Sequence, residues 1–546
     1  MAVRTLAQVS FFDPEFVMPR CLEAGTLPWL LARYRSRLFP SWLFSGWRGA
    51  SARGRRAWPA PVLMTLILLR WSEGGMSRLA AVSRAQSDAV WRAAMGLQFG
   101  APTPSEKTLR DFERLLRRRH TDVGLVRYML LHGHLVRLCR EEGLGGEDAS
   151  WGTDSTPMWC YGAVLDTVRL LGDGARRLVR LWARASRTGA DQVAAQWGLG
   201  DLWSGKSTKG GLKADWRDTA SRCAAIDKLA QRVLDAVAFV HQRLQHAAKD
   251  KRKELQALGK RLLIVITQNL EADHDGRLVV ATRVAANRLA SLSDPQARHG
   301  RKTASQAYTG FKVHMLGDAV SGLIASLTVT CGNQHDATVT SRLVNRAKEL
   351  LGSFRRLWAD TAYGGAELRH ELLQRHGVQV LAPPPVGGGH PEGRLAKQEF
   401  AIDFEAQTAT CPNGVTTSLR DEGWSAEHAR PAWRFHWRKE DCQLCPLRQQ
   451  CLGSGRGHKK LLLHAYEPEL RKAREDWSDP KVREEYKRRS QHERLINSLT
   501  RHGARQARGW GLSSANLQAH SVAMANNLKL LAVALARKEE TTTLAA

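Results

Sequence analysis

The sequence predicts an α/β protein with a strand-and-helix core, a helical region before that core and two insertions within it. Three observations lead to this prediction. Residues 1–140 show mostly helical patterns, residues 141–383 alternate between strand and helix patterns, and residues 384–480 are rich in Pro, Gly and Cys. The last segment, 481–546, again has helical periodicity. A chain of 546 residues is long enough for several such domains.

The chain is strongly basic. It contains 82 Lys and Arg residues against 53 Asp and Glu residues, which gives a formal net charge of +29 and a pI near 10.3. An excess of this size indicates a polyanionic partner, most simply double-stranded DNA. Clustered arginines also favour forked contacts with phosphate. A generally basic soluble protein without such a partner is the alternative.

Neither a signal peptide nor a membrane span is expected. The N-terminal residues 1–16 lack a long apolar segment, and the best apolar run, residues 62–69, is too short to cross a bilayer. The cysteine count is nine, which is odd, and nothing else suggests secretion. We therefore expect a cytoplasmic protein whose cysteines are free thiols or metal ligands.

The first 140 residues are expected to form helices that bind DNA. An apolar helix is expected at residues 61–71, and a later helix carries five arginines between Arg110 and Arg119. This pattern is typical of a helix-turn-helix region, and a helical bundle with a basic face explains it equally well. Arginine and tryptophan are interleaved before the apolar helix, as Arg33, Arg35, Arg37, Arg48, Arg53, Arg55 and Arg56 with Trp42, Trp47 and Trp58.

The core region begins with a short extended run that Pro157 is expected to stop, which places Asp154 at a strand end. A second aspartate, Asp360, directly follows another short apolar strand. Further elements are expected in this order: a helical insertion at about 160–260, a strand at 262–267, a hairpin at 308–316 and 323–330, a helix at 337–351, the strand at 354–359, a helix at 364–376 and a strand at 378–382.

Four cysteines, Cys411, Cys442, Cys445 and Cys451, fall in the inserted segment 384–480. A Cys-x-x-Cys pair with two further cysteines is typical of a tetrahedral zinc site. A structural zinc ion would help so small and turn-rich a domain to fold. Buried free thiols are the alternative.

The segment from Tyr486 to His502 is expected to be one helix, because it contains neither Gly nor Pro. At 3.6 residues per turn, Tyr486, Arg489, Glu493 and Thr500 fall on one face of it. A carboxylate in so basic a run is either a surface ion-pair partner or a metal ligand that faces a polyanion. Beyond it, residues 512–537 are expected to form an amphipathic core helix, and residues 539–546 are expected to be disordered.

These motifs together resemble those of DDE-type transposases of bacterial insertion sequences, which have an RNase H-like fold. The spacing of Tyr486, Arg489 and Glu493 is that of the family's signature helix, in which a lysine follows six residues later. Here Thr500 takes the place of the lysine and Arg501 follows it. The runs around the two aspartates are also similar to the family's, as are Asp294–Gly300, Tyr308–Lys312 and Gly332–Asp336. The predicted order of strands and helices agrees with an RNase H-like fold.

The resemblance implies that Asp154, Asp360 and Glu493 are the catalytic residues and hold two Mg²⁺ ions, or Mn²⁺ in their place. Two such ions stabilise the attacking and leaving oxygens of a phosphodiester, and Mg²⁺ needs only a few carboxylate ligands. Tyr486, Arg489 and Arg501 are expected to contact DNA phosphates.

The implied activity is DNA transposition. The protein would bind the terminal inverted repeats of its element, cleave the ends, and join the 3′-OH ends to target DNA as a homodimer in the nucleoid. Two alternatives stay open: a transposase-derived DNA-binding protein that no longer cuts, and a structure-specific nuclease on the same fold.

Overall fold

The computed structural model describes residues 22–47, 57–98, 100–162, 164–283, 285–303, 305–385, 393–425, 430–452, 457–464 and 466–545. The N-terminal residues 1–16, where no signal peptide is expected, lie outside these ranges, as do Arg48, Arg53, Arg55 and Arg56. The chain divides into two compact units. The first unit comprises residues 1–148, 155–335 and 494–546, and the second comprises residues 149–154 and 336–493.

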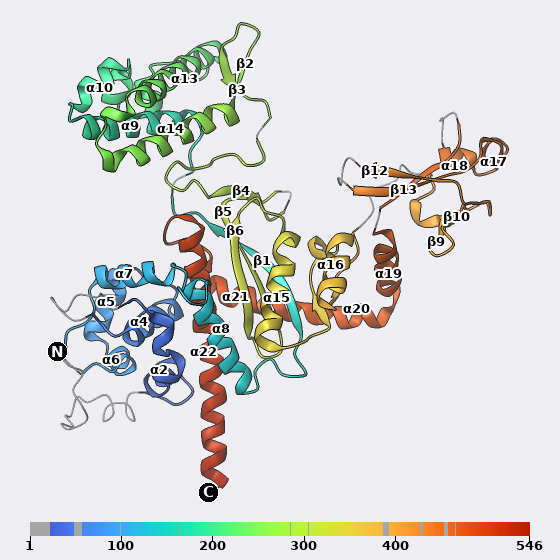
Figure 1. Cartoon of the computed structure of the whole chain (residues 1–546), viewed down its shortest axis with the longest axis horizontal. Coiled ribbons are helices and arrows are strands. Elements are labelled where there is room, and N and C mark those ends of the chain that lie inside the picture. The colour runs from blue at the N-terminus through green and yellow to red at the C-terminus, as the bar shows by residue number, and fades with distance from the viewer. Residues whose placement is uncertain are drawn as a thin grey trace. The chain divides into compact units, whose positions relative to one another are not determined.

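Helices follow one another through the first part of the first unit (Figure 1). Arg70, which is buried, donates to Oε1 of Glu113 at 2.8 Å, and Arg78 donates to Oε2 of the same carboxylate at 2.6 Å. Some of the basic residues in this region therefore hold helices together. The elements are α2 (Leu27–Arg33), α3 (Arg35–Leu38), η1 (Ser41–Phe44), α4 (Ala60–Ser72), α5 (Arg78–Ser87), α6 (Ala89–Met95), α7 (Glu106–Leu116) and α8 (Arg127–Glu141).

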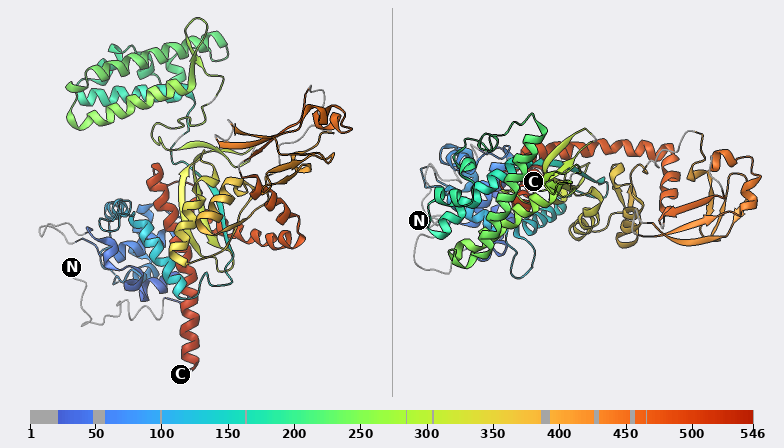
Figure 2. Two further views of the ribbon diagram at one scale, coloured as in Figure 1. Left: turned by 45° about the vertical axis from the view of Figure 1, so that its right-hand side comes forward. Right: turned by 90° about the horizontal axis from the view of Figure 1, so that it is seen from above.

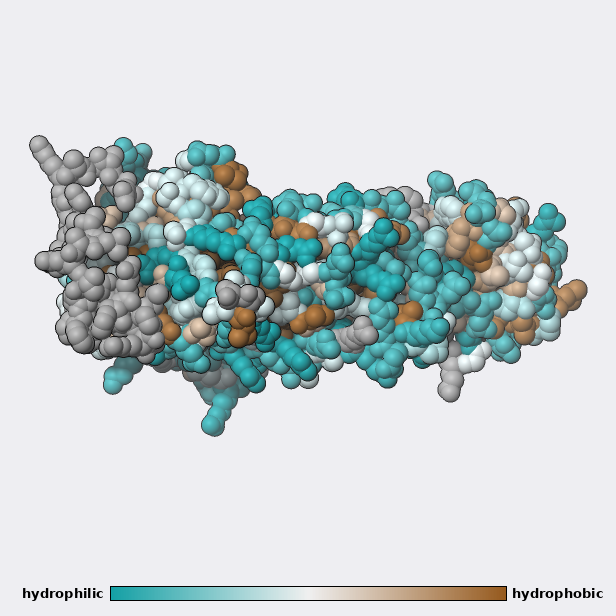
Figure 3. Space-filling model, turned by 90° about the horizontal axis from the view of Figure 1, so that it is seen from below, coloured by the Kyte–Doolittle hydropathy of each residue, from teal (hydrophilic) through white to brown (hydrophobic). Residues whose placement is uncertain are grey.

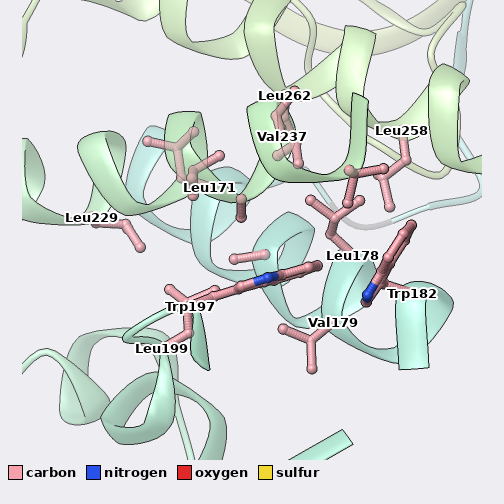
Figure 4. Close-up of a cluster of buried hydrophobic side chains, with 14 of the residues drawn as sticks. Leu171, Leu178, Val179, Trp182, Trp197, Leu199, Leu229, Val237, Leu258 and Leu262 are labelled. Carbon is pink, nitrogen blue, oxygen red and sulfur yellow. The ribbon is translucent and has the colours of Figure 1, made fainter. Parts of the chain in front are cut away.

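The helical insertion is a bundle with its own apolar core (Figure 4). The prediction of a strand at residues 262–267 was wrong, because this run lies inside helix α14. Leu262, Val265 and Ile266 are three and four residues apart and buried, so the apolar run is the core face of a helix. The elements are α9 (Thr167–Ser186), α10 (Ala190–Gln196), α11 (Gly200–Ser204), α12 (Thr208–Gly211), α13 (Thr219–Gln242), η2 (Leu244–His246), α14 (Lys249–Asn269) and the hairpin of β2 (Leu270–Ala272) and β3 (Leu278–Val280).

Leu262→Ala is expected to speed amide hydrogen exchange in α9, α13 and α14 by about 30-fold or more, because truncating a buried leucine costs about 2–5 kcal/mol. The site is tight: a Cβ built on Gly174 would lie 2.3 Å from Cδ2 of Leu262. Exchange measured by mass spectrometry on the full chain tests this. Leu263→Ala is the matched control, since Leu262 is fully buried and Leu263 is 40% exposed. Equal effects of the two variants would contradict the helical assignment.

Strand β1 (Trp151–Trp159) contributes to both units. The prediction that Pro157 ends this strand was wrong: the strand continues through Trp159, so Asp154 lies inside it and not at its end. In the first unit it neighbours β5 (Ala307–Asp318), which pairs antiparallel with β4 (Arg298–Arg301) and β6 (Ile324–Cys331). In the second unit it pairs parallel with β7 (Arg356–Trp358), and β7 pairs parallel with β8 (Gln379–Leu381). The expected hairpin is therefore present, as are the expected strand of Asp154 and the two strands expected after the hairpin.

The C-terminal helix α22 (Gly511–Ala545) covers the edge of strand β6 (Figure 2). The side-chain oxygens of Asn516 and Asn527 accept hydrogen bonds from the N–H groups of Val329 and Ile324 at 2.9 and 3.0 Å. A helix that covers a sheet edge in this way protects the edge from pairing with another chain. The prediction that residues 539–546 are disordered was wrong, because α22 continues through Ala545. An ion pair of 3.1 Å between Glu539 and Arg33 helps to hold this end of the helix in place.

The second unit contains a small β domain, which in the order of the chain follows α16 and precedes α19 (Figure 1). Phe400, Phe435 and Trp437 lie at the centre of its apolar core. Before the domain come η3 (Asp336–Val339), α15 (Thr340–Leu351), η4 (Thr361–Tyr363), α16 (Ala366–His376) and η5 (Lys397–Glu399). The domain itself contains β9 (Ala401–Asp403), β10 (Thr408–Thr410), β11 (Thr416–Thr417), β12 (Arg420–Ser425), β13 (Arg430–His436), α17 (Lys439–Gln443), α18 (Arg448–Leu452) and β14 (Lys460–His464).

The single helix expected from Tyr486 to His502 is interrupted, so that prediction was wrong. After α19 (Glu467–Ser478), helix α20 (Pro480–Tyr486) ends in the 3-10 turn η6 (Lys487–Arg489), and α21 (Ser490–Leu499) begins anew. The π-helical turn η7 (Thr500–Ala504) follows, with Gly503 at φ 108°. Tertiary contacts of Tyr486 and Arg489 override the local helical preference at the turn. Tyr486 and Glu493 therefore do not share the face of one continuous helix.

The surface visible in Figure 3 is mainly hydrophilic, and apolar residues appear on it in small separate patches. Such scattered apolar residues are normal for a protein surface in water. Within the described ranges, no helix combines the length and the apolar character that crossing a membrane requires.

Candidate active site

The two aspartates come from neighbouring parallel strands: Asp154 lies in β1, and Asp360 lies two residues beyond the end of β7. Gly152 of β1 is in register with Trp358 of β7. Asp154 follows the first of these residues by two positions, and Asp360 follows the second by two. Because side chains in extended chain alternate between faces with a period of two, both carboxylates project on the same side. The pairing therefore brings together two residues that are far apart in sequence.

Arg489 contacts both carboxylates. Its Nη2 atom lies 3.4 Å from Oδ2 of Asp154 and 3.8 Å from Oδ2 of Asp360. The side chains of Asp154 and Arg489 are 16% and 19% exposed, whereas that of Asp360 is 39% exposed. The two carboxylates thus share the positive charge of one guanidinium. The site is partly buried, and Asp360 is its most exposed side chain.

Tyr486 positions the end of α20 against the strand that carries Asp360. Its hydroxyl donates to the carbonyl of Ala359 at 3.0 Å, and its ring packs against Trp358 and Trp477. Burial raises the pKa of the Tyr486 hydroxyl. Asp360 itself caps the turn η4 by accepting the N–H of Ala362 at 2.9 Å. Tyr486 therefore holds the backbone next to a candidate catalytic carboxylate.

Glu493 lies on α21 in the same unit and is exposed. Within the described ranges, the Glu493 carboxylate makes no hydrogen bond or ion pair. The preceding residue, His492, fixes α21 to the start of β1. Its Nε2 donates to the carbonyl of Ser150 at 2.9 Å, and its ring lies so close to Gly152 that a Cβ there would be 2.3 Å from it.

Arg501, the other residue expected to contact DNA, belongs to the first unit. It lies exposed in the turn η7, next to Thr500. An exposed arginine in an irregular turn is free to reach a phosphate, and its role in DNA binding stays a prediction.

The pair of aspartates fits a divalent cation by its chemistry. Carboxylate oxygens are the ligands that Mg²⁺ prefers, and the guanidinium of Arg489 shows that a positive charge is accommodated beside both. Across the residues that the structure describes, however, no group of three or more His, Cys, Asp and Glu side chains stands in the geometry of a metal site. Binding of metal by Asp154, Asp360 and Glu493 therefore stays a prediction.

The four cysteines named from the sequence are brought together by the fold. Cys411, Cys442, Cys445 and Cys451 line one cavity of about 20 Å³ in the small β domain, and none of them forms a disulfide. Burial raises the pKa of the Cys451 thiol, the cation of Lys459 lowers it, and the other three thiols raise it further. The four thiols are thus close enough to influence one another electrostatically.

Sequence reasoning missed Gly152 and His492. A glycine inside a strand often marks a close approach by another part of the chain, so Gly152, two residues before Asp154, was a signal that could have been used. Nothing in the sequence could identify His492 as the residue that approaches it. That pairing depends on where α21 meets β1.

One comparison with known proteins bears on the family. The family model described as a transposase DDE domain matches residues 410–532. This range includes the four cysteines together with Tyr486, Arg489, Glu493 and Arg501, whereas Asp154 and Asp360 precede it. No solved structure matches the chain. The chain therefore carries a transposase DDE domain over residues 410–532, which confirms the resemblance to DDE-type transposases that its sequence motifs indicated.

Proposed function

We propose that this protein is the transposase of a bacterial insertion sequence: it binds the terminal inverted repeats, cleaves the DNA ends by metal-assisted phosphodiester hydrolysis, and joins the 3′-OH ends to target DNA. One observation carries the proposal. Asp154 and Asp360 each follow the paired residues Gly152 and Trp358 of adjacent parallel strands by two positions. They share the guanidinium of Arg489, which comes from the segment that leads into the helix of Glu493.

The catalytic core is of the RNase H-like kind in this proposal. Its support is the order of elements: a strand with Asp154, a hairpin, a helix, a strand that Asp360 follows, a helix, a strand, and a distant helix with Glu493. The parallel pairing of β1 with β7 agrees with that order, because it brings the two aspartates together. The helical bundle and the cysteine-containing domain are then insertions in this core.

The proposed metal ligands are Asp154, Asp360 and Glu493, which would hold two Mg²⁺ ions, or Mn²⁺ in their place. Bound there, the metal ions would neutralise charge that develops on the attacking and leaving oxygens and lower the pKa of a bound water. Arg489 would have to leave at least one carboxylate, and its guanidinium is then available to a DNA phosphate. Tyr486 would keep the strand end at Asp360 in place through its bond to the Ala359 carbonyl.

DNA is the partner that the transposase domain implies, and the net charge of +29 supports extensive phosphate contact. The arginine-rich helices before residue 141 are the proposed region that recognises the ends. A homodimer is the proposed active form, since two ends must be held together before they are joined. Phosphate contacts alone position the protein without reading sequence, so base contacts must come in addition.

The test is end cleavage in vitro. A labelled DNA end with the terminal inverted repeat that flanks this gene is incubated with the full chain and Mg²⁺, beside the variants Asp360→Asn and Glu493→Gln. We expect cutting at the repeat boundary by the wild type, and binding without cutting by both variants. Glu484→Gln is the matched control, because Glu484 is exposed on the neighbouring α20 and pairs only with Lys487 in the described chain; it should cut as the wild type does.

Each alternative has its own outcome. Binding of the repeats without cutting in Mg²⁺ or Mn²⁺ would make the protein a silent DNA-binding derivative. Cutting of branched DNA in preference to repeat ends would make it a structure-specific nuclease. Cutting by Asp360→Asn or Glu493→Gln at the wild-type rate would refute the site assignment.

A further inference from the structure

We infer that the small β domain of the second unit is a zinc-binding module in which Cys411, Cys442, Cys445 and Cys451 hold one structural Zn²⁺ ion. This inference does not depend on the proposed catalytic activity. It concerns a site some distance along the chain from the candidate catalytic residues, and it rests on four observations of the cysteine cavity.

The first observation is that three separate pieces of chain deliver the thiols to one place. Cys411 directly follows β10 and begins a tight turn, in which its carbonyl accepts the N–H of Gly414 at 2.8 Å and its N–H donates to Val415 at 3.0 Å. Cys442 lies on α17 and Cys445 just beyond it. Cys451 lies on α18. One cysteine thus comes from a turn, and the other three come from two short helices or the residues just after them. A structural metal ion can cross-link such short segments.

The second observation is the size and lining of the cavity. Its volume of about 20 Å³ has room for a single small ion or water, and all four cysteines line it. Zn²⁺ in structural sites takes four ligands in a tetrahedron at Zn–S distances of about 2.3 Å. In this structure, the four thiols do not have the spacing of a metal site. All four border the same cavity, and zinc binding would draw their sulfur atoms together around it.

The third observation concerns the groups around the thiols. The backbone N–H of Lys459 donates to Sγ of Cys442 at 3.5 Å, and N–H groups directed at a ligating sulfur are a usual support for a metal–thiolate centre. Four thiolates and one Zn²⁺ carry a net charge of about −2. Two basic side chains, those of Arg448 and Lys459, and one acidic side chain, that of Asp441, also line the cavity, so the charged lining offsets part of that negative charge.

The fourth observation is that these basic groups are themselves held in place. Arg448 donates to the carbonyl of Cys442 at 2.9 Å. Lys459 donates to the carbonyl of Cys451 at 3.3 Å, and its ammonium lies 5.2 Å from the centre of the Phe400 ring. Cys411, Cys442 and Cys451 pack against the apolar core of the domain, which contains only six fully buried side chains in the described chain. So small a core gains much from a metal cross-link.

The test is metal analysis of the full chain purified without chelator. We expect about one zinc per chain in the wild type by plasma mass spectrometry, as a single four-cysteine site requires. The double variant Cys442→Ser/Cys445→Ser should contain almost none. Cys223→Ser is the matched control, because Cys223 is a half-buried free thiol on α13 outside this domain, and it should keep the full zinc content.

Cobalt provides a second readout that does not require a variant to fold. After zinc is removed from the wild type, Co²⁺ should produce the absorption bands of a tetrahedral tetrathiolate centre, saturating at about one ion per chain. Zinc should then displace it. A wild type that contains no zinc and gives no thiolate–cobalt bands would overturn the inference. So would a Cys442→Ser/Cys445→Ser variant that keeps its zinc.

Discussion

Asp154→Asn is expected to abolish both chemical steps of transposition while it leaves DNA binding intact. Cleavage of a repeat end and joining of a pre-cut 3′-OH end should each slow by about 10³-fold or more, because metal stabilisation of the transition state is worth several kcal/mol and each 1.36 kcal/mol is a factor of ten. Binding should persist, since the substitution removes a negative charge and releases Arg489 from one of its two carboxylate partners. Gel shift and strand-transfer assays on the same preparations measure the three quantities.

A companion variant distinguishes a metal ligand from a residue that only holds Arg489. Asp154→Cys should be inactive with Mg²⁺ and regain part of its activity with Mn²⁺, because a thiolate favours a softer metal. Asp275→Asn, in the exposed turn between β2 and β3, serves as a control that should behave as the wild type. Loss of DNA binding by Asp154→Asn in proportion to its loss of cleavage would contradict a catalytic role and indicate a structural one.

Gly152→Ala is expected to lower end cleavage by about 10²-fold, because a misplacement of about 1 Å near a reacting centre has an effect of this size. A methyl group at this position would lie 2.3 Å from the ring of His492, and the strand backbone of β1 is held by its pairing with β7. The ring must therefore move, and with it α21 and Glu493. This prediction rests on the proposed activity and tests how the site is positioned.

A double variant separates this effect from simple unfolding. Adding His492→Ala to Gly152→Ala removes the clash and should recover part of the lost activity, a coupling that a double-mutant cycle measures directly. Gly365→Ala is the matched control: it is another glycine of the second unit, close in sequence to Asp360, and a Cβ there meets nothing within 4 Å. Cleavage by Gly152→Ala at the wild-type rate would show that the contact between α21 and β1 does not position Glu493.

Local patterns were reliable where one physical signal dominates. Alternation of apolar and polar residues predicted the hairpin that β5 and β6 form, since the pleat of a strand directly produces that period. The motifs around Tyr486, Arg489 and Glu493 predicted the family, and the match over residues 410–532 confirms it. The spacing of the four cysteines predicted that they meet, and they line one cavity.

Local patterns failed where tertiary contacts decide which of two local structures a segment adopts. The apolar run at 262–267 has strand character by composition, yet it is the buried face of α14 because the neighbouring helices of the bundle offer it an apolar surface. The segment from Tyr486 to His502 has no helix breaker, yet Lys487–Arg489 form a 3-10 segment, where Tyr486 bonds to the Ala359 carbonyl and Arg489 contacts Asp154. The C-terminal tail is polar, yet it continues a helix that Glu539 helps to anchor.

The sequence by itself determined the residue types of the candidate site, the basic character of the chain and the resemblance of its motifs to those of DDE-type transposases. It could not determine the register that aligns Gly152 with Trp358, and so sets Asp154 beside Asp360, because strand pairing joins segments about 200 residues apart. Nor could it determine that His492 lies against Gly152, or that Arg489 lies between the aspartates. Those contacts depend on packing between segments that are distant in sequence, and the position of each segment is fixed only when the other is in place.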